Sequence, residues 1–215
     1  MNRLELGLYV ITASDPSRGR EHLDVARAAL EGGADALQLR EKDRGAAEIY
    51  RVAVGVRELL EKSGSKCLFL VNDRLDVALA CGADGVHLGQ EDLPAAAARA
   101  LLREGMVLGV SAGTVEEALR AQEEGADYLG VGPVFPTPSK PDAGEPLGLE
   151  VLRSICEAVT VPVVAVGGIN EGNLEKVFEA GAGGIAVISA VSSAQDMLQA
   201  VRRLRRAVDS CRRRG

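Results

Sequence analysis

Three polar side chains alternate along one short stretch of the sequence. Gln38, Arg40 and Lys42 occupy every second position of "QLREK". In an extended chain, residues at this spacing point to the same side. Two cations and an amide on one side suit a ligand that is rich in phosphate. We therefore predict an anion-binding site at this stretch.

Two aspartates extend this prediction to a metal. Asp73 in "VNDRLD" and Asp92 in "HLGQED" each follow a short apolar run. Carboxylates at two neighbouring strand ends could hold Mg²⁺ together with water and ligand oxygens, and Asn72 could bind the same ligand. Taken alone, each aspartate could equally cap a helix. Opposite Arg40 and Lys42, the pair is better interpreted as the metal half of a diphosphate site.

A second anion site is predicted further along the chain. We expect Gly167-Gly168 in "AVGGIN" to expose backbone N–H groups at the N-terminus of a helix, where anions bind readily. Ile188 and Ser189, in "AVISAVS", would add another amide and a hydroxyl. Amides and hydroxyls without a cluster of cations suit a monophosphate.

The stretch "GVGPVFPTPSKP" at 130–141 contains four prolines, which exclude a helix and make a central strand improbable. Thr137, Ser139 and Lys140 lie among these prolines. Prolines reduce the freedom that a loop loses when it closes, so they favour a functional loop over a disordered spacer. We interpret the stretch as a loop between the two anion sites, with Thr137 and Ser139 toward the monophosphate and Lys140 toward the diphosphate.

The elements that must position these residues are marked by a repeated phrase. A Gly-Ala step precedes a short apolar run in "GGADALQL" (32–39), "CGADGVHL" (81–88), "EGADYLGV" (124–131) and "AGAGGIAV" (180–187). Glycine suits the left-handed position just after a helix, and the apolar run is typical of a buried strand. The phrase therefore predicts a helix-to-strand turn that is used four times.

Further strands are expected at about 6–12, 66–71, 106–110 and 162–166. Helices are expected at about 20–32, 44–62, 74–81, 94–103, 114–124, 148–158, 171–180 and 194–209, and Thr114 with Glu117 has the spacing of a capping box. Eight strands alternating with eight helices predict an α/β fold, a (β/α)₈ (TIM) barrel formed by residues 1–215 as one domain. Residues 194–215 would be the last helix and a basic tail. A doubly wound open sheet is the alternative.

In such a barrel the ends of the strands share one site, and here the polar residues follow the strands. Other candidates carry less weight. His22 has no partner that can be named, and His87 is more typical of a satisfied barrel residue than of a catalyst. Ser111 has no evident base, so we interpret it as a hydrogen-bond partner and not as a nucleophile.

Composition excludes several classes of function. The chain of 215 residues has a net charge of −6, which argues against nucleic-acid or membrane binding. Four scattered cysteines and no recognisable signal peptide indicate reduced thiols in the cytoplasm. The oligomeric state is not determined by the sequence, and a homodimer is one option.

Taken together, Gln38-x-Arg40-x-Lys42, Asn72-Asp73, "GQED", "GVSAGT", "GPVFPTPSK" and "GGI" resemble the thiamine-phosphate synthase family across residues 6 to 192. Such enzymes are (β/α)₈ barrels that join a pyrimidine diphosphate to a thiazole phosphate and release diphosphate, by a dissociative Mg²⁺-assisted reaction. Three residues depart from the pattern that is common in the family. Ser139 stands where a second threonine is common and keeps the hydroxyl, whereas Leu39 and Gly113 affect the expected packing of the pyrimidine.

The resemblance implies a role for each matching residue. For the pyrimidine diphosphate it implies Gln38, Leu39, Arg40, Glu41, Lys42, Asn72, Ser111 and Lys140, of which Arg40, Lys42, Ser111 and Lys140 would be catalytic. For Mg²⁺ it implies Asp73 and Asp92. For the thiazole phosphate it implies Thr137, Pro138, Ser139, Gly168, Ile188 and Ser189.

Three alternatives stay open at this point. The first is a thiazole tautomerase on the same barrel, which needs the thiazole-phosphate pocket but not the full diphosphate site. The second is a barrel that binds phosphorylated ligands without catalysis, since a fold alone does not define a function. The third is a phosphate-binding barrel of amino-acid or sugar metabolism, which would not explain the paired acids.

Overall fold

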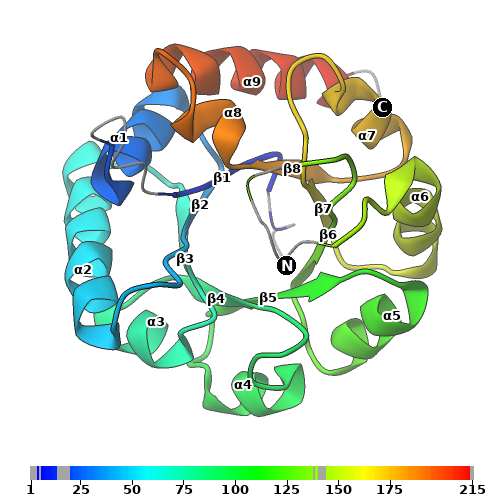
Figure 1. Cartoon of the computed structure of the whole chain (residues 1–215). Coiled ribbons are helices and arrows are strands. Elements are labelled where there is room, and N and C mark those ends of the chain that lie inside the picture. Colours follow the sequence, from blue (N-terminus) through cyan, green and yellow to red (C-terminus); the bar gives the residue numbers. More distant parts are fainter. Residues whose placement is uncertain (1–3, 5, 14–19, 138, 140–143, 214–215) are drawn as a thin grey trace.

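A computed structural model shows the chain as a closed barrel of eight parallel strands inside a ring of helices (Figure 1). The structure describes residues 4, 6–13, 20–137, 139 and 144–213. The strands are β1 (Leu8–Ile11), β2 (Ala36–Leu39), β3 (Leu68–Asn72), β4 (Gly85–Leu88), β5 (Val107–Ala112), β6 (Tyr128–Val131), β7 (Val163–Val166) and β8 (Gly184–Val187). Each strand pairs with the next in sequence order, and β8 closes on β1. The predicted (β/α)₈ barrel is confirmed, and the open sheet is excluded.

The helices are α1 (His22–Gly32), α2 (Ala46–Ser63), α3 (Leu75–Cys81), α4 (Ala95–Leu101), α5 (Val115–Glu123), α6 (Gly148–Ala158), α7 (Leu174–Glu179), α8 (Ser189–Ser192) and α9 (Met197–Arg212). The expected number of eight was wrong, because the described residues include the short α8 directly after β8. A four-residue helix has no periodicity to detect. None of the helices in the described ranges is both long and apolar enough to span a membrane.

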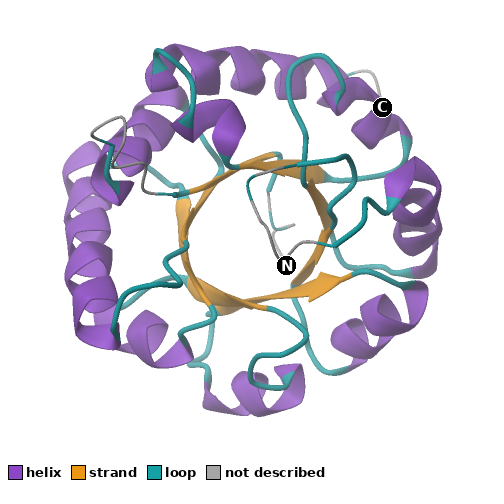
Figure 2. Cartoon of the chain, in the orientation of Figure 1, coloured by secondary structure: helices purple, strands orange, loops and turns teal. Residues whose placement is uncertain are grey.

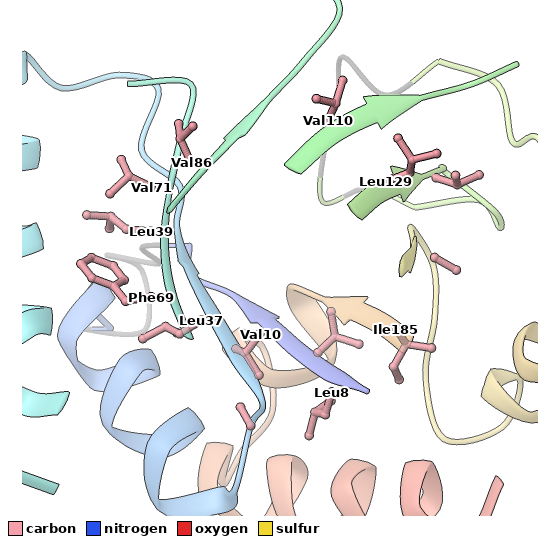
Figure 3. Close-up of a cluster of buried hydrophobic side chains, with 14 of the residues drawn as sticks. Leu8, Val10, Leu37, Leu39, Phe69, Val71, Val86, Val110, Leu129 and Ile185 are labelled. Carbon is pink, nitrogen blue, oxygen red and sulfur yellow. The ribbon is translucent and has the colours of Figure 1, made fainter. Parts of the chain in front are cut away.

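Two apolar cores hold the barrel together, because successive residues of a strand point to opposite faces. The larger core lies between the ring of strands and the surrounding helices, the two layers drawn in Figure 2. Leu37, Leu39 and Phe69 belong to it (Figure 3). The smaller core lies inside the barrel and includes Tyr9 and Tyr128. Side chains therefore fill the interior of the barrel.

The repeated Gly-Ala phrase forms the turn that the sequence predicts. All four of its glycines have left-handed backbone angles, with φ from 67° to 98°: Gly33, Gly82, Gly125 and Gly181. The aspartate of the phrase then caps the preceding strand. Asp35, Asp84 and Asp127 accept the backbone N–H of Leu8, Phe69 and Leu108 at 2.7, 2.8 and 2.7 Å.

Each of these three aspartates also pairs with an arginine from a helix: Arg205, Arg57 and Arg99, at 2.6, 3.3 and 3.0 Å. In the fourth copy Gly183 occupies the aspartate position and keeps only the backbone bond to Val163. The phrase thus closes the end of the barrel at which the strands begin. At the other end, where the strands finish, the connecting loops carry the polar residues.

Candidate active site

A cavity of about 690 Å³ opens where the strands end. Side chains from the loops after β2, β3, β4, β5, β6, β7 and β8 line it. Eleven of the residues selected from the sequence lie in its wall: Arg40, Lys42, Asn72, Asp73, Asp92, Ser111, Thr137, Ser139, Gly168, Ile188 and Ser189. These residues therefore line one cavity at the strand ends, while its role as a shared binding site and the ligand of each residue stay predictions.

The acidic part of the wall is a pair of facing carboxyl groups. Burial, a hydrogen bond with Asp92 and the charge of Asp92 raise the pKa of Asp73 from 3.8 to about 6, although Lys42 and Arg40 oppose the shift. The ammonium of Lys42 lies 3.8 Å from Asp73 Oδ2. The backbone of Asp73 is left-handed, with φ of 60°, which is uncommon outside glycine. Two carboxyl groups are thus held together although Lys42 and Arg40 only partly offset their repulsion.

Neither aspartate caps a helix through its side chain. The cap position of α3 is Arg74 and that of α4 is Pro94, and neither helix has a side-chain cap. Asp92 instead accepts the backbone N–H of Gly89 at 2.6 Å, which fixes its carboxylate at the cavity wall. The cap interpretation is therefore excluded for both residues.

The donor set fits Mg²⁺. The charge of Asp92 helps to raise the pKa of Asp73, and a divalent cation between the two carboxylates would remove this repulsion. Mg²⁺ prefers one or two carboxylates together with water and phosphate oxygens. Within the described residues, His, Cys, Asp and Glu form no group of three or more that could enclose a metal on their own. An ion bound by Asp73 and Asp92 would therefore keep positions open for a ligand.

The opposite wall is built from hydroxyl groups. Ser139 Oγ donates to Ser189 Oγ at 2.8 Å, which joins the proline-rich loop to the end of β8. Ser139 N–H in turn donates to Thr137 Oγ1 at 3.2 Å. The expected proximity of this loop and Ser189 is confirmed.

Gly167 and Gly168 have a different structural role from the one expected. They do not begin a helix, since α7 starts at Leu174. Both have positive φ, and a Cβ on Gly168 would lie 2.6 Å from the carbonyl oxygen of Pro136. The pair therefore allows the proline-rich loop to approach the end of β7. The N–H groups of Val134 and Phe135 donate to the carbonyls of Val166 and Gly167, at 2.9 and 3.1 Å, and hold the start of the loop there.

Three of the selected residues within the described part of the chain do not line the cavity. Gln38 is 2% exposed and donates to the hydroxyl of Tyr9 at 2.7 Å. Leu39 points away from the barrel axis into the outer core (Figure 3). Glu41 pairs with His22 and Arg44, each at 3.2 Å. Because successive residues of an extended chain point to opposite faces, Leu39 and Glu41 point away from the cavity that Arg40 lines. Pro138 and Lys140 lie outside the described residues.

Two groups of polar contacts near the cavity were not predicted from the sequence. His22, 1% exposed, bonds to Thr12 Oγ1 at 2.7 Å and to Glu41 Oε2 at 3.2 Å, and Thr12 Oγ1 accepts the N–H of Arg40 at 3.3 Å. This buried group supports the backbone of the Arg40 loop. Gln90 Nε2 donates to the carbonyl of Ser111 at 2.6 Å. Gln90 could have been found, because it lies in the "GQED" motif, whereas the partners of His22 are remote in the sequence.

His87 is hydrogen-bonded inside the barrel, as the sequence predicts, but the expectation that Ser111 has no base nearby was wrong, because the two residues meet only in the folded barrel. His87 Nδ1 lies 2.8 Å from the hydroxyl of Tyr128 and Nε2 lies 2.9 Å from Ser111 Oγ. His87 is therefore a satisfied barrel residue, and Ser111 is a hydrogen-bond partner at the cavity wall.

Fold and site together define a (β/α)₈ barrel whose cavity at the strand ends has a carboxylate pair and cations on one wall and hydroxyls on the other. The family model described as thiamine monophosphate synthase matches residues 8–191, and the chain belongs to this family.

Similar proteins agree with this assignment over nearly the full length. The chain is 53% identical over 205 residues to a thiamine-phosphate synthase of Moorella thermoacetica, covering 95% of this chain and 97% of the relative. It is 50% identical over 212 residues to that of Methanocella arvoryzae, covering 99% of each. A solved structure of thiamine phosphate pyrophosphorylase from Pyrococcus furiosus aligns with a TM-score of 0.87 at 46% identity, covering 97% of this chain and 98% of the other.

Proposed function

We propose that this protein is a thiamine-phosphate synthase. It joins 4-amino-5-hydroxymethyl-2-methylpyrimidine diphosphate to a carboxythiazole or hydroxyethylthiazole phosphate, and the products are thiamine phosphate and diphosphate. One observation supports this best. A single cavity holds the carboxylate pair Asp73 and Asp92 beside Lys42 on one wall and the hydroxyls of Ser139 and Ser189 on the other.

Asp73 and Asp92 would hold Mg²⁺ at the diphosphate. When bound there, the ion stabilises the negative charge that the diphosphate gains as it leaves. Arg40 and Lys42 bind the diphosphate oxygens from the same wall, and Lys140 is predicted to join them. These cations neutralise charge where it develops, which is the main source of rate in such sites.

The reaction needs no protein nucleophile or general base. The bond between the pyrimidine methylene carbon and the diphosphate oxygen breaks, and its electron pair leaves with the diphosphate. The thiazole nitrogen then donates its lone pair to the carbocation and forms the C–N bond. Ser111 and Asn72 orient the pyrimidine diphosphate, so binding geometry and electrostatics account for the rate.

The second wall holds the thiazole phosphate. Ser139 and Ser189 are already hydrogen-bonded to each other, so their hydroxyls converge on one point of the cavity. Thr137, Gly168 and Ile188 line the same region. Hydroxyls and backbone amides provide neutral donors that suit a monophosphate without competing for the Mg²⁺-bound diphosphate.

Release of diphosphate by the purified protein tests this function. With both substrates and Mg²⁺ we expect equal amounts of diphosphate and thiamine phosphate, and neither product in EDTA. The alternative is a thiazole tautomerase, which would isomerise the carboxythiazole phosphate and release no diphosphate. The carboxylate pair favours the synthase, because an isomerisation has no diphosphate to bind. Isomerised thiazole without diphosphate would reverse this choice.

Other properties stay predictions from the sequence. We predict two phosphorylated small molecules as the only substrates, no nucleic-acid or membrane partner, a cytoplasmic location and, as one option, a homodimer. The preference between the two thiazole phosphates is open to the same assay with each substrate in turn.

A further inference from the structure

Five polar side chains form a continuous hydrogen-bonded chain through the interior of the barrel. In order they are Gln38, Tyr9, Tyr128, His87 and Ser111, which we call the barrel relay. Its four contacts measure 2.7, 2.9, 2.8 and 2.9 Å. The members come from β2, β1, β6, β4 and β5, so the relay crosses the barrel and ends at the cavity wall.

Two strand positions carry glycine, which leaves room for the rings of this relay. A Cβ on Gly109 would lie 2.2 Å from the ring of Tyr128, and a Cβ on Gly130 would lie 2.8 Å from the imidazole of His87. Both glycines therefore leave space that the aromatic rings occupy. Tyr9 and Tyr128 are 1% and 0% exposed, so their hydroxyls must find partners inside the protein.

If every buried hydroxyl of the barrel relay donates its hydrogen to an acceptor, the four hydrogen bonds all run in one direction, from Gln38 to Ser111. The amide nitrogen of Gln38 can only donate, so the oxygen of Tyr9 accepts from it. Tyr9 then donates to Tyr128, because its hydrogen would otherwise be buried without an acceptor. By the same reasoning Tyr128 donates to Nδ1 of His87. Burial raises the pKa of both tyrosines, so the two hydroxyls keep their protons.

The direction of the relay determines the tautomer of His87. Since Nδ1 accepts from Tyr128, the proton of the imidazole is on Nε2 and is donated to Ser111 Oγ. Ser111 Oγ is then an acceptor toward His87, so its own hydrogen is available to an acceptor in the cavity that Ser111 lines. We propose that Tyr128 is a positioning residue of the reaction: through the tautomer of His87 it makes the hydroxyl of Ser111 a donor to the pyrimidine diphosphate.

The tautomer can be observed directly. The chain has only two histidines, so ¹⁵N-histidine labelling gives few imidazole signals, and His87→Gln assigns them. We expect a protonated Nε2 and an unprotonated Nδ1 for His87 in the wild type, and a changed proton distribution in Tyr128→Phe, which removes one hydroxyl and keeps the ring. A proton on Nδ1 in the wild type would overturn the proposal.

Kinetics test the consequence, and this part rests on the proposed function. Tyr128→Phe should lower kcat/KM for the pyrimidine diphosphate about tenfold, the effect of losing one buried hydrogen bond. In a Ser111→Ala background the same substitution should have no further effect, because the relay acts through Ser111. Tyr50→Phe is the matched control, since Tyr50 is the remaining tyrosine of the chain and is 41% exposed on α2.

Each outcome has one meaning. A purely structural role for Tyr128 would lower Tm and leave kcat/KM and the His87 signals unchanged, which contradicts the proposal. Additive effects of Tyr128→Phe and Ser111→Ala would contradict it too. If the wild type releases no diphosphate, the proposed function fails, whereas the NMR experiment still decides whether the relay sets the tautomer.

Discussion

Replacing Asp73 by asparagine should stabilise the metal-free protein and abolish its activity. The substitution removes the charge that faces Asp92 but keeps the shape of the side chain. Asparagine also tolerates the left-handed backbone that Asp73 adopts, with φ of 60°, so no new strain is introduced. Stability and function should therefore change in opposite directions.

The magnitude follows from the pKa. Raising the pKa of Asp73 from 3.8 to about 6 makes its ionised form costlier in the folded protein by about 3 kcal/mol, at about 1.4 kcal/mol per tenfold change in proton affinity. Because the side chain is still 23% exposed and Asp92 can take up the proton instead, we expect about 1–2 kcal/mol. This corresponds to a rise in Tm of about 2–8 °C for a chain of this size.

The pH dependence has a defined sign. The folded protein binds the Asp73 proton more tightly than the unfolded chain, so the metal-free wild type loses stability as the pH rises from the ordinary value of 3.8 to about 6. Above that window the full penalty is present. The Asp73→Asn variant should lack this decline.

Thermal unfolding in EDTA at pH 7.5, and diphosphate release with Mg²⁺, measure the two effects. Asp76→Asn is the matched control: this neighbouring aspartate is 62% exposed, and its pairing with Arg74 lowers its pKa. The control should keep its activity and show no rise in Tm. A lower Tm for Asp73→Asn in EDTA, or turnover that still responds to Mg²⁺, would refute the assignment of Asp73.

Three further predictions concern the metal, the second wall and the barrel. Mg²⁺ affinity should be about tenfold weaker at pH 5 than at pH 8, because protons compete for Asp73; a Mg²⁺ titration that does not vary with pH contradicts this. Ser189→Ala should raise KM for the thiazole phosphate about tenfold and leave KM for the pyrimidine diphosphate unchanged in steady-state assays, and equal changes would exclude a separate pocket. Gly184→Ala should cost about 3 kcal/mol in urea unfolding, because its Cβ would lie 1.7 Å from a backbone oxygen, whereas Gly183→Ala, with its nearest atom at 3.7 Å, should cost under about 0.5 kcal/mol.

Local patterns in the sequence were enough to predict the barrel. Four Gly-Ala turns and alternating apolar runs determine where helices end and strands begin, and these features depend only on neighbouring residues. The cap at Thr114 was predictable for the same reason, and its hydroxyl accepts the N–H of Glu117 at 3.2 Å. The short α8 was missed because four residues are too few to show a helical period.

The site was predictable as a set but not in its detailed contacts. The barrel topology alone brings residues at the strand ends together, which placed Asp73 beside Asp92. Alternation along an extended chain does not tell how deep each side chain lies. Gln38 therefore reached the buried interior while Lys42 reached the cavity. The pairing of His22 with Glu41 depends on two loops meeting in space, and no local pattern encodes that.

Aspartates at the two ends of the barrel have opposite effects for one physical reason. Asp35 accepts a backbone N–H at 2.7 Å and pairs with Arg205 at 2.6 Å, so its carboxylate has a donor and a cation beside it where the strands begin. Asp73 faces another carboxyl group where the strands end, and its charge is only partly offset by Lys42. Since the metal-free protein would favour a neutral residue at position 73, the carboxylate there agrees with the proposed Mg²⁺ site. Aspartates are thus paired with arginines where the strands begin, whereas the end where the strands finish keeps a carboxylate whose charge is unfavourable in the metal-free protein.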